Sequence, residues 1–262
     1  MKKLLLILLA VVLMLSLVAC GSGAVEEKAT LVLGTSADYP PFEFIILDEN
    51  GDKQYVGIDI SFSEKLAEDM GLELEIVNMS FDNLMASLQK GDVDMVVAAI
   101  EANEERAKVA DFSDAYYTDL PPMLLVKAEN SSQYIGLESF EGKAIGAQMA
   151  TTKADIVTND MPGATLITMT TVTDLVNNVV YDKCDGIVLD GAVAMNYAEN
   201  DESLVVADVN LGEAYPYAVA VQKDDPLGLL ESFNKTIAQL ASDSSLDEWI
   251  ESANLLSDQA TE

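Results

Sequence analysis

The sequence contains no histidine, two cysteines and only 14 lysines and arginines among its 262 residues. Zinc and copper sites are built largely from histidine and cysteine, so we expect no metal, and no motif indicates another cofactor. The 45 aspartates and glutamates give a formal net charge of −31 at pH 7. Nucleic-acid binding requires lysine and arginine to neutralise phosphates, so this charge excludes it. Otherwise the acidity is typical of a well-hydrated surface.

The first residues have the order of a secretory signal. Lys2 and Lys3 form a basic start, and an apolar run of about fifteen residues, broken only by Ser16, follows. A membrane-spanning helix, the alternative, needs roughly twenty such residues. We therefore predict a signal peptide over residues 1–19 and a flexible tether over residues 20–29.

The two cysteines have different predicted roles. Cys20 lies at the end of the predicted signal, so Cys184 is the only cysteine in the body of the chain. No internal disulfide can form, although an oxidising compartment would permit one. Because no histidine is present to activate it, Cys184 is predicted to be a buried structural thiol, not a nucleophile.

Strand-like and helix-like segments alternate along the chain, which favours an α/β fold with mostly parallel sheets. The predicted strands cover residues 31–35, 72–77, 94–100, 143–148, 164–169 and 186–189. The predicted helices cover residues 59–70, 80–90, 151–160, 173–181 and 191–199, and another amphipathic helix is expected to begin at Pro226. The strand-helix order restarts near residue 143, which indicates two lobes.

Two extended segments lie outside this alternation, residues 123–127 and 217–222, and we predict that they cross between the lobes. Lobe 1 then comprises residues 30–122 and 223–257, because the C-terminal helices return to it. Lobe 2 comprises residues 123–222.

Ligands of open α/β sheets bind at the carboxyl ends of strands, so the loops that follow the predicted strands hold the candidate residues. Tyr39, in a loop stiffened by prolines, can present an aromatic face. Arg106 can bind one carboxylate through two parallel hydrogen bonds, or it can form a surface ion pair with neighbouring acidic residues. Thr152 and Asp190 can contact an anion and an ammonium group, or each can cap a helix. Together the four side chains suit an α-amino acid.

Six ordered motifs carry a family resemblance over essentially all of the chain beyond the signal. They are GTSADYPPFEF (34–44), GDVDMVVAAI (91–100), EERAKVADFSDAYY (104–117), GKAIGAQMATT (142–152), CDGIVLD (184–190) and PYAVAVQKDDP (216–226). The chain resembles the polar amino-acid-binding proteins of bacterial ABC importers. The resemblance implies a type II periplasmic-binding-protein-like fold, whose two lobes close on the ligand about two crossing strands.

The resemblance also implies roles for single residues. The positions that match Arg106 and Thr152 bind the ligand α-carboxylate, the one that matches Asp190 binds the α-ammonium, and the one that matches Tyr39 stacks on the ligand. The full predicted ligand site is Tyr39, Ile58, Ala99, Glu101, Arg106, Gln148, Thr151, Thr152 and Asp190. Leu-Val-Ala-Cys resembles a lipobox, which implies that Cys20 carries a lipid and holds the protein outside the bacterial cell membrane.

The sequence departs from the family pattern in the predicted cleft. Ile58 stands where an aromatic residue is usual, and Ser36 stands where relatives with basic ligands often carry an acid. Ala99 and Ala150 replace a small or hydroxyl residue and a glycine. Glu101 stands where serine or threonine is common, and three possibilities remain open: it receives a cation, holds Arg106, or turns away from the cleft.

Binding without catalysis is the leading functional prediction, with a monomer that closes on a free amino acid and docks on the permease and ATPase subunits of an importer. One alternative is a secreted enzyme of the same fold, similar to dehydratases, with Glu101 as the acid. Another is a ligand-sensing lipoprotein or an adhesin.

Overall fold

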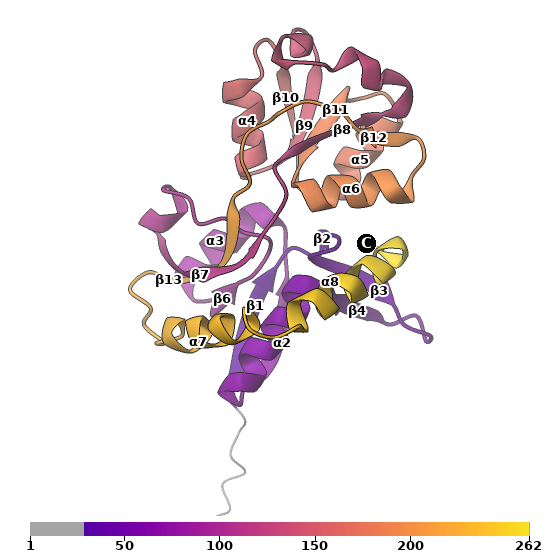
Figure 1. The fold of residues 1–262 in the computed structure, drawn as a ribbon. Coiled ribbons are helices and arrows are strands. Elements are labelled where there is room, and N and C mark those ends of the chain that lie inside the picture. The colour runs from indigo at the N-terminus through magenta and orange to yellow at the C-terminus, as the bar shows by residue number, and fades with distance from the viewer. Residues whose placement is uncertain (1–28, 262) are drawn as a thin grey trace, which may run out of the picture.

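The computed structural model describes residues 29–261, so the predicted signal peptide and all of the predicted tether except Ala29 lie outside the described residues. Two five-stranded sheets and one three-stranded sheet form the framework. Figure 1 shows one large sheet in each of two lobes that lie one above the other. We call the lobe that holds β1 lobe 1 and the lobe that holds β9 lobe 2.

Lobe 1 is built on a mixed sheet with the strand order β5-β1-β6-β13-β7. Its strands are β1 (Thr30–Thr35), β5 (Glu73–Asn78), β6 (Met95–Val96), β7 (Ala110–Thr118) and β13 (Pro216–Gln222). The small antiparallel sheet beside it consists of β2 (Asp38–Tyr39), β3 (Glu43–Leu47) and β4 (Lys53–Val56). Its helices are α2 (Ile58–Met70), α3 (Phe81–Lys90), α7 (Leu230–Leu240) and α8 (Ser245–Leu256), with the short 3-10 helices η1 (Arg106–Lys108) and η4 (Ser257–Gln259).

Lobe 2 is built on a second mixed sheet, with the order β10-β9-β11-β8-β12. Its strands are β8 (Met123–Lys127), β9 (Ala144–Gln148), β10 (Thr165–Met169), β11 (Gly186–Leu189) and β12 (Leu204–Val206). Its helices are α4 (Thr152–Asp160), α5 (Val172–Val180) and α6 (Gly191–Asn200), with 3-10 helices η2 (Ala128–Gln133) and η3 (Leu137–Phe140). Because β9, β10 and β11 run parallel, their carboxyl ends meet at one edge, which faces lobe 1.

The predicted α/β alternation and the two lobes are confirmed, but neither predicted crossing segment crosses between the lobes. The segment 123–127 forms β8, which pairs with β11 and β12 within the sheet of lobe 2. The sequence pattern places the segment 217–222 in lobe 2, but β13 pairs antiparallel with β6 and β7 in the sheet of lobe 1. Its alternating small and apolar residues are buried between those strands, so it completes that sheet. The chain therefore crosses between the lobes in the connection that precedes β8, residues 119–122, and within the connection that follows β12, residues 207–215 (Figure 1).

Two predicted elements are shorter than expected. The apolar run 94–100 forms a strand only at Met95–Val96, and Ala99, three residues after the strand ends, has a φ of 45°, which does not fit an extended strand. The helix expected at Pro226 begins at Leu230. Asp225 accepts hydrogen bonds from the N–H groups of Leu229 (2.9 Å) and Leu230 (3.1 Å), so this aspartate fixes the start of the helix.

Gly57 holds the start of α2 against the loop that carries Tyr39. Its φ of 123° and ψ of 176° belong to a region that essentially only glycine adopts, and a Cβ there would lie 2.1 Å from the carbonyl oxygen of Phe42.

We expect Gly57→Ala to lower the free energy of unfolding by at least about 3 kcal/mol. Gly51→Ala is the control, since Gly51 also has a positive φ (86°) but a Cβ added there would meet no atom within 4 Å, and we expect a loss of about 1–2 kcal/mol. Urea unfolding would measure both, and equal losses would contradict the steric argument.

Candidate functional site

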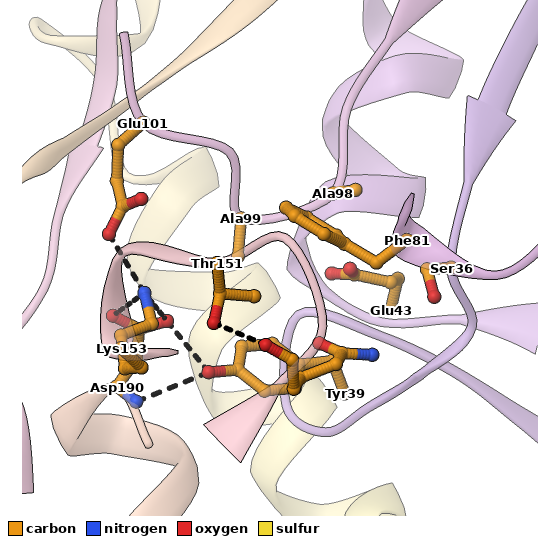
Figure 2. Close-up of a pocket in the computed structure, with 11 residues that line it drawn as sticks. Ser36, Tyr39, Glu43, Phe81, Ala98, Ala99, Glu101, Thr151, Lys153 and Asp190 are labelled. Atoms are coloured by element: carbon orange, nitrogen blue, oxygen red, sulfur yellow. Dashed lines mark hydrogen bonds and ion pairs between the residues drawn. The ribbon is translucent and has the colours of Figure 1, made fainter. Parts of the chain in front are cut away.

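A small cavity lies between the two lobes, at the carboxyl ends of the strands of both sheets. Its volume is about 10 Å³, room for roughly one water molecule. Figure 2 shows the side chains that surround it. The lining residues are Ser36, Tyr39, Glu43, Phe81, Ala98, Ala99, Glu101, Gln148, Thr151, Lys153 and Asp190.

Asp190 follows β11 and points into the gap from lobe 2. Its carboxylate accepts a hydrogen bond from the Tyr39 hydroxyl (2.7 Å) and another from the Lys153 ammonium (2.8 Å). The N–H of Asp190 in turn donates to the Tyr39 oxygen (3.1 Å). Although Asp190 occupies the N-cap position of α6, its side chain makes no capping bond. Of the two roles that the sequence allows for Asp190, the structure therefore supports the binding of a cation and not the capping of α6.

Glu101 reaches the same gap from lobe 1, with 3% of its surface exposed. Its carboxylate accepts from Arg106 Nη1 (3.2 Å), from the Thr152 hydroxyl (2.9 Å) and from Lys153 Nζ (2.8 Å). Burial alone raises the pKa of Glu101, but the charges of Lys153 and Arg106 outweigh it and hold this pKa below its ordinary value. The possibility that Glu101 turns away from the cleft is wrong, since it both receives a cation and holds Arg106.

Arg106, the only arginine in the sequence, is fixed by the loop that precedes it. The Asn103 side chain accepts a hydrogen bond from the Arg106 N–H (2.8 Å) at the start of the 3-10 helix η1. The guanidinium donates to the Glu101 carbonyl (3.0 Å) and, across the gap, to the Ala150 carbonyl (3.1 Å). It also lies over the Phe81 ring at 5.3 Å from the ring centre. The guanidinium is therefore held at the junction of the lobes.

A second pair of acidic side chains is formed by Glu43, which lines the cavity, and Asp59. Burial raises the pKa of Glu43 well above its ordinary value, and burial raises the pKa of Asp59 to about 6. Asp59 accepts from the Ala99 N–H (2.6 Å) and the Tyr116 hydroxyl (2.8 Å), and it shares a hydrogen bond with Glu43. Because the pKa of Glu43 is raised more strongly than that of Asp59, Glu43 is the protonated member of the pair. One of the Glu43 oxygens has no hydrogen-bond partner among the described residues.

The adjacent threonines have separate roles. The Thr151 hydroxyl accepts from the Ala154 N–H (3.3 Å), so it caps α4, and it donates to the Gln148 carbonyl (2.7 Å). The Gln148 amide donates to the Thr170 carbonyl (3.0 Å) within lobe 2. Only Thr152 of the two threonines reaches across to Glu101. The cap position therefore decides which hydroxyl is available to the cleft.

The chain from residue 31 to residue 252 matches the family of bacterial extracellular solute-binding proteins, family 3. The protein belongs to this family. It is 32% identical to the arginine-binding extracellular protein ArtP of Bacillus subtilis, over 95% of this chain and 96% of the relative.

Solved structures support the same assignment. The Streptococcus pneumoniae protein AbpA bound to L-arginine has a TM-score of 0.83 and 31% identity, over 89% of this chain and 97% of that one. An ancestral amino acid-binding protein, described as a precursor of cyclohexadienyl dehydratase, has a TM-score of 0.77 and 32% identity, over 86% of this chain and 95% of that one. The predicted type II binding-protein fold is confirmed. The prediction that the chain is an extracytoplasmic solute-binding protein of the ABC-transporter type is also confirmed. Within residues 29–261, no helix has the length and apolar character to cross a membrane.

The structure of this solute-binding protein brings most of the predicted site together. Tyr39, Ala99, Glu101, Gln148, Thr151 and Asp190 line the cavity, and Arg106 and Thr152 bind Glu101 just behind the lining. Ile58, by contrast, does not line the cavity, and its side chain is packed into the core with 1% exposed.

Sequence reasoning missed Lys153, which lies at the centre of the site with 4% exposed. Burial lowers its pKa, but Asp190 and Glu101 outweigh burial and raise this pKa above its ordinary value. Lys153 is in the first turn of α4, where the helix dipole disfavours a cation. A lysine at such a position, directly after Thr152, is the signal that could have indicated a buried carboxylate partner.

Proposed function

We propose that this protein captures an amino acid between its lobes and delivers it to an ABC importer. The observation that carries the proposal is that Asp190 of lobe 2 lines the buried cavity between the lobes, while Arg106 of lobe 1 lies just behind the lining, bound to Glu101. A cation and an anion from opposite lobes match the carboxylate and ammonium of an α-amino acid. A ligand that contacts both lobes stabilises the closed arrangement.

A basic amino acid, with arginine first, is the ligand we propose. The relatives named above include an arginine-binding protein and an arginine-bound structure. The Phe81 and Tyr39 rings and the Glu43 carboxyl group line the cavity, and a cationic side chain can pack against such rings and carboxyl groups. A cation beside Glu43 would lower the pKa of this side chain and favour its ionised form.

Titration of purified protein with the twenty common L-amino acids, followed by thermal unfolding, tests this proposal. A ligand at 100 times its dissociation constant adds about 2.7 kcal/mol to stability, so arginine or lysine is expected to raise the melting temperature by several degrees. If none of the amino acids stabilises the protein, the proposed function is contradicted. If only acidic or aliphatic amino acids stabilise it, only the proposal of a basic ligand is contradicted.

We propose binding without catalysis, even though one structural relative is described as the precursor of a dehydratase. The candidate acid is Glu101, but its carboxylate is paired with Lys153 and Arg106, which favour its ionised form. A general acid needs a proton to give at the working pH. Incubation with prephenate followed by mass spectrometry tests this, and a dehydrated, decarboxylated product would contradict it.

The lipid anchor at Cys20, the monomeric state and docking on permease and ATPase subunits remain proposals that rest on the family resemblance. Mass spectrometry of the mature N-terminus tests the first of them. A diacylglyceryl adduct on Cys20 is expected, and a mature chain that begins elsewhere would contradict the anchor.

A further inference from the structure

The side chains of Glu101 and Lys153 make the contacts that an amino-acid head group is expected to make. Arg106 and Thr152, predicted to bind a ligand carboxylate, instead bind the Glu101 carboxylate at 3.2 Å and 2.9 Å. Asp190, predicted to bind a ligand ammonium, binds the Lys153 ammonium at 2.6 Å. The two mimicking groups are themselves 2.8 Å apart (Figure 2).

We propose that Glu101 and Lys153 form a built-in mimic of an amino-acid head group, which competes with the ligand and sets its affinity. The inference rests on the proposed function, since it concerns the same cleft. A ligand ammonium can reach Asp190 only when Lys153 withdraws. A ligand carboxylate can reach Arg106 and Thr152 only when Glu101 withdraws.

The pair also links the lobes. Glu101 belongs to lobe 1 and Lys153 to lobe 2, and both side chains are at least nine-tenths buried. Their ion pair therefore closes the gap through protein atoms alone, beside the Tyr39–Asp190 bond. The form that the mimic holds closed excludes the ligand. The apparent affinity for the ligand is therefore the intrinsic affinity multiplied by the fraction of molecules that are not in this form.

The arrangement makes each half of the mimic separately removable. Lys153→Met leaves Glu101 paired with Arg106 and leaves Asp190 hydrogen-bonded to Tyr39, while it frees Asp190 for a ligand ammonium. Glu101→Ser leaves Lys153 paired with Asp190, while it frees Arg106 for a ligand carboxylate. Each change leaves the remaining charged groups with at least one hydrogen-bond partner, so both variants are expected to fold with lower stability than the wild type.

The control is Lys143→Met. Lys143 also pairs with an aspartate of lobe 2, Asp185 at 3.2 Å, but the pair lies within that lobe and neither residue lines the cavity. It tests whether loss of any lysine–aspartate pair in lobe 2 changes ligand affinity.

Isothermal titration of the wild type and the three variants tests the proposal. The probes are the twenty common L-amino acids and two analogues of arginine: agmatine, which lacks the carboxylate, and 5-guanidinopentanoate, which lacks the α-ammonium. Lys153→Met is expected to tighten binding of arginine and agmatine at least tenfold and to tighten 5-guanidinopentanoate by a smaller factor, because both variants remove the ion pair that holds the closed form. Glu101→Ser is expected to tighten arginine and 5-guanidinopentanoate by more than it tightens agmatine. Lys143→Met is expected to match the wild type.

Two results separate failure of the mimic from failure of the proposed function. If the wild type binds an amino acid and neither variant binds any amino acid more tightly, the mimic is overturned and the proposed function stands. If the wild type and every variant bind no amino acid, the proposed function is overturned and the mimic with it. Should Lys153→Met not fold, Lys153→Gln replaces it with the same expectations.

Discussion

Replacement of Asp190 by asparagine is expected to weaken ligand binding by about thirty-fold to several thousand-fold, or about 2–5 kcal/mol. Asparagine has nearly the same shape but no charge, so a bound ammonium would lose its anionic partner on lobe 2 at this edge of the sheet. The change also weakens the contact between the lobes, because Tyr39 would donate to a neutral amide instead of a carboxylate. Calorimetric titration with the ligand of the wild type would measure the loss.

Asp185→Asn provides a matched control for this prediction. Asp185 and Asp190 lie immediately before and after β11, and each is paired with a lysine of lobe 2. Asp185 supports the lobe by accepting from the Ala144 N–H (2.8 Å) and does not line the cavity. Its replacement should lower stability and leave the dissociation constant within a factor of about three. An equal loss of affinity in both variants would show that Asp190 acts only through the stability of lobe 2.

The fold was predictable because it depends on patterns that repeat along the chain. Alternation of strand and helix fixed the class, and the rule that ligands bind at strand ends led to Arg106 and Asp190 as a pair from separate lobes. What pattern reasoning could not supply is the pairing order of the strands. The apolar segment 217–222 reads equally well as a connection or as a sheet strand, and only its contacts with β6 and β7 decide.

The chemistry of the site was less predictable, because it depends on contacts between residues far apart in the sequence. Glu101 and Lys153 are 52 positions apart, and neither signals the other locally. The sequence marked Glu101 as a departure but offered several roles, and it did not mark Lys153. Once the lobes are placed together, two residues of opposite charge compensate each other in one buried ion pair, which a single sequence without its fold does not reveal.

Buried carboxyl groups lead to the second large expected effect, a loss of stability as the pH rises. Burial raises the pKa of Asp38, Asp59 and Asp119 to about 6 each, from an ordinary value of 3.8. The folded protein therefore holds protons that the unfolded chain releases between these values. The contribution of these groups is fully present below about pH 3.8 and is lost as the pH rises through about 6.

For Asp59 alone, a shift from 3.8 to about 6 corresponds to an upper limit of about 3 kcal/mol. Repulsion within a chain of net charge −31 acts in the same direction, because deprotonation increases it. Glu101 acts in the opposite direction, since its pKa is lowered and its contribution is lost only as the pH falls through that lowered value. We therefore expect a higher melting temperature near pH 5 than at pH 8.

Glu43→Gln tests the origin of this dependence. Burial and the neighbouring charge of Asp59 raise the pKa of Glu43 well above its ordinary value, and glutamine keeps a donor for Asp59 without a proton to lose. The variant is expected to unfold at a higher temperature than the wild type at pH 8 and to flatten the change between pH 5 and pH 8. Glu75→Gln, an exposed position on β5, is the control and is expected to follow the wild type. A melting temperature that rises from pH 5 to pH 8 in the wild type, or a Glu43→Gln profile parallel to it, would show that these buried carboxyl groups do not control the stability.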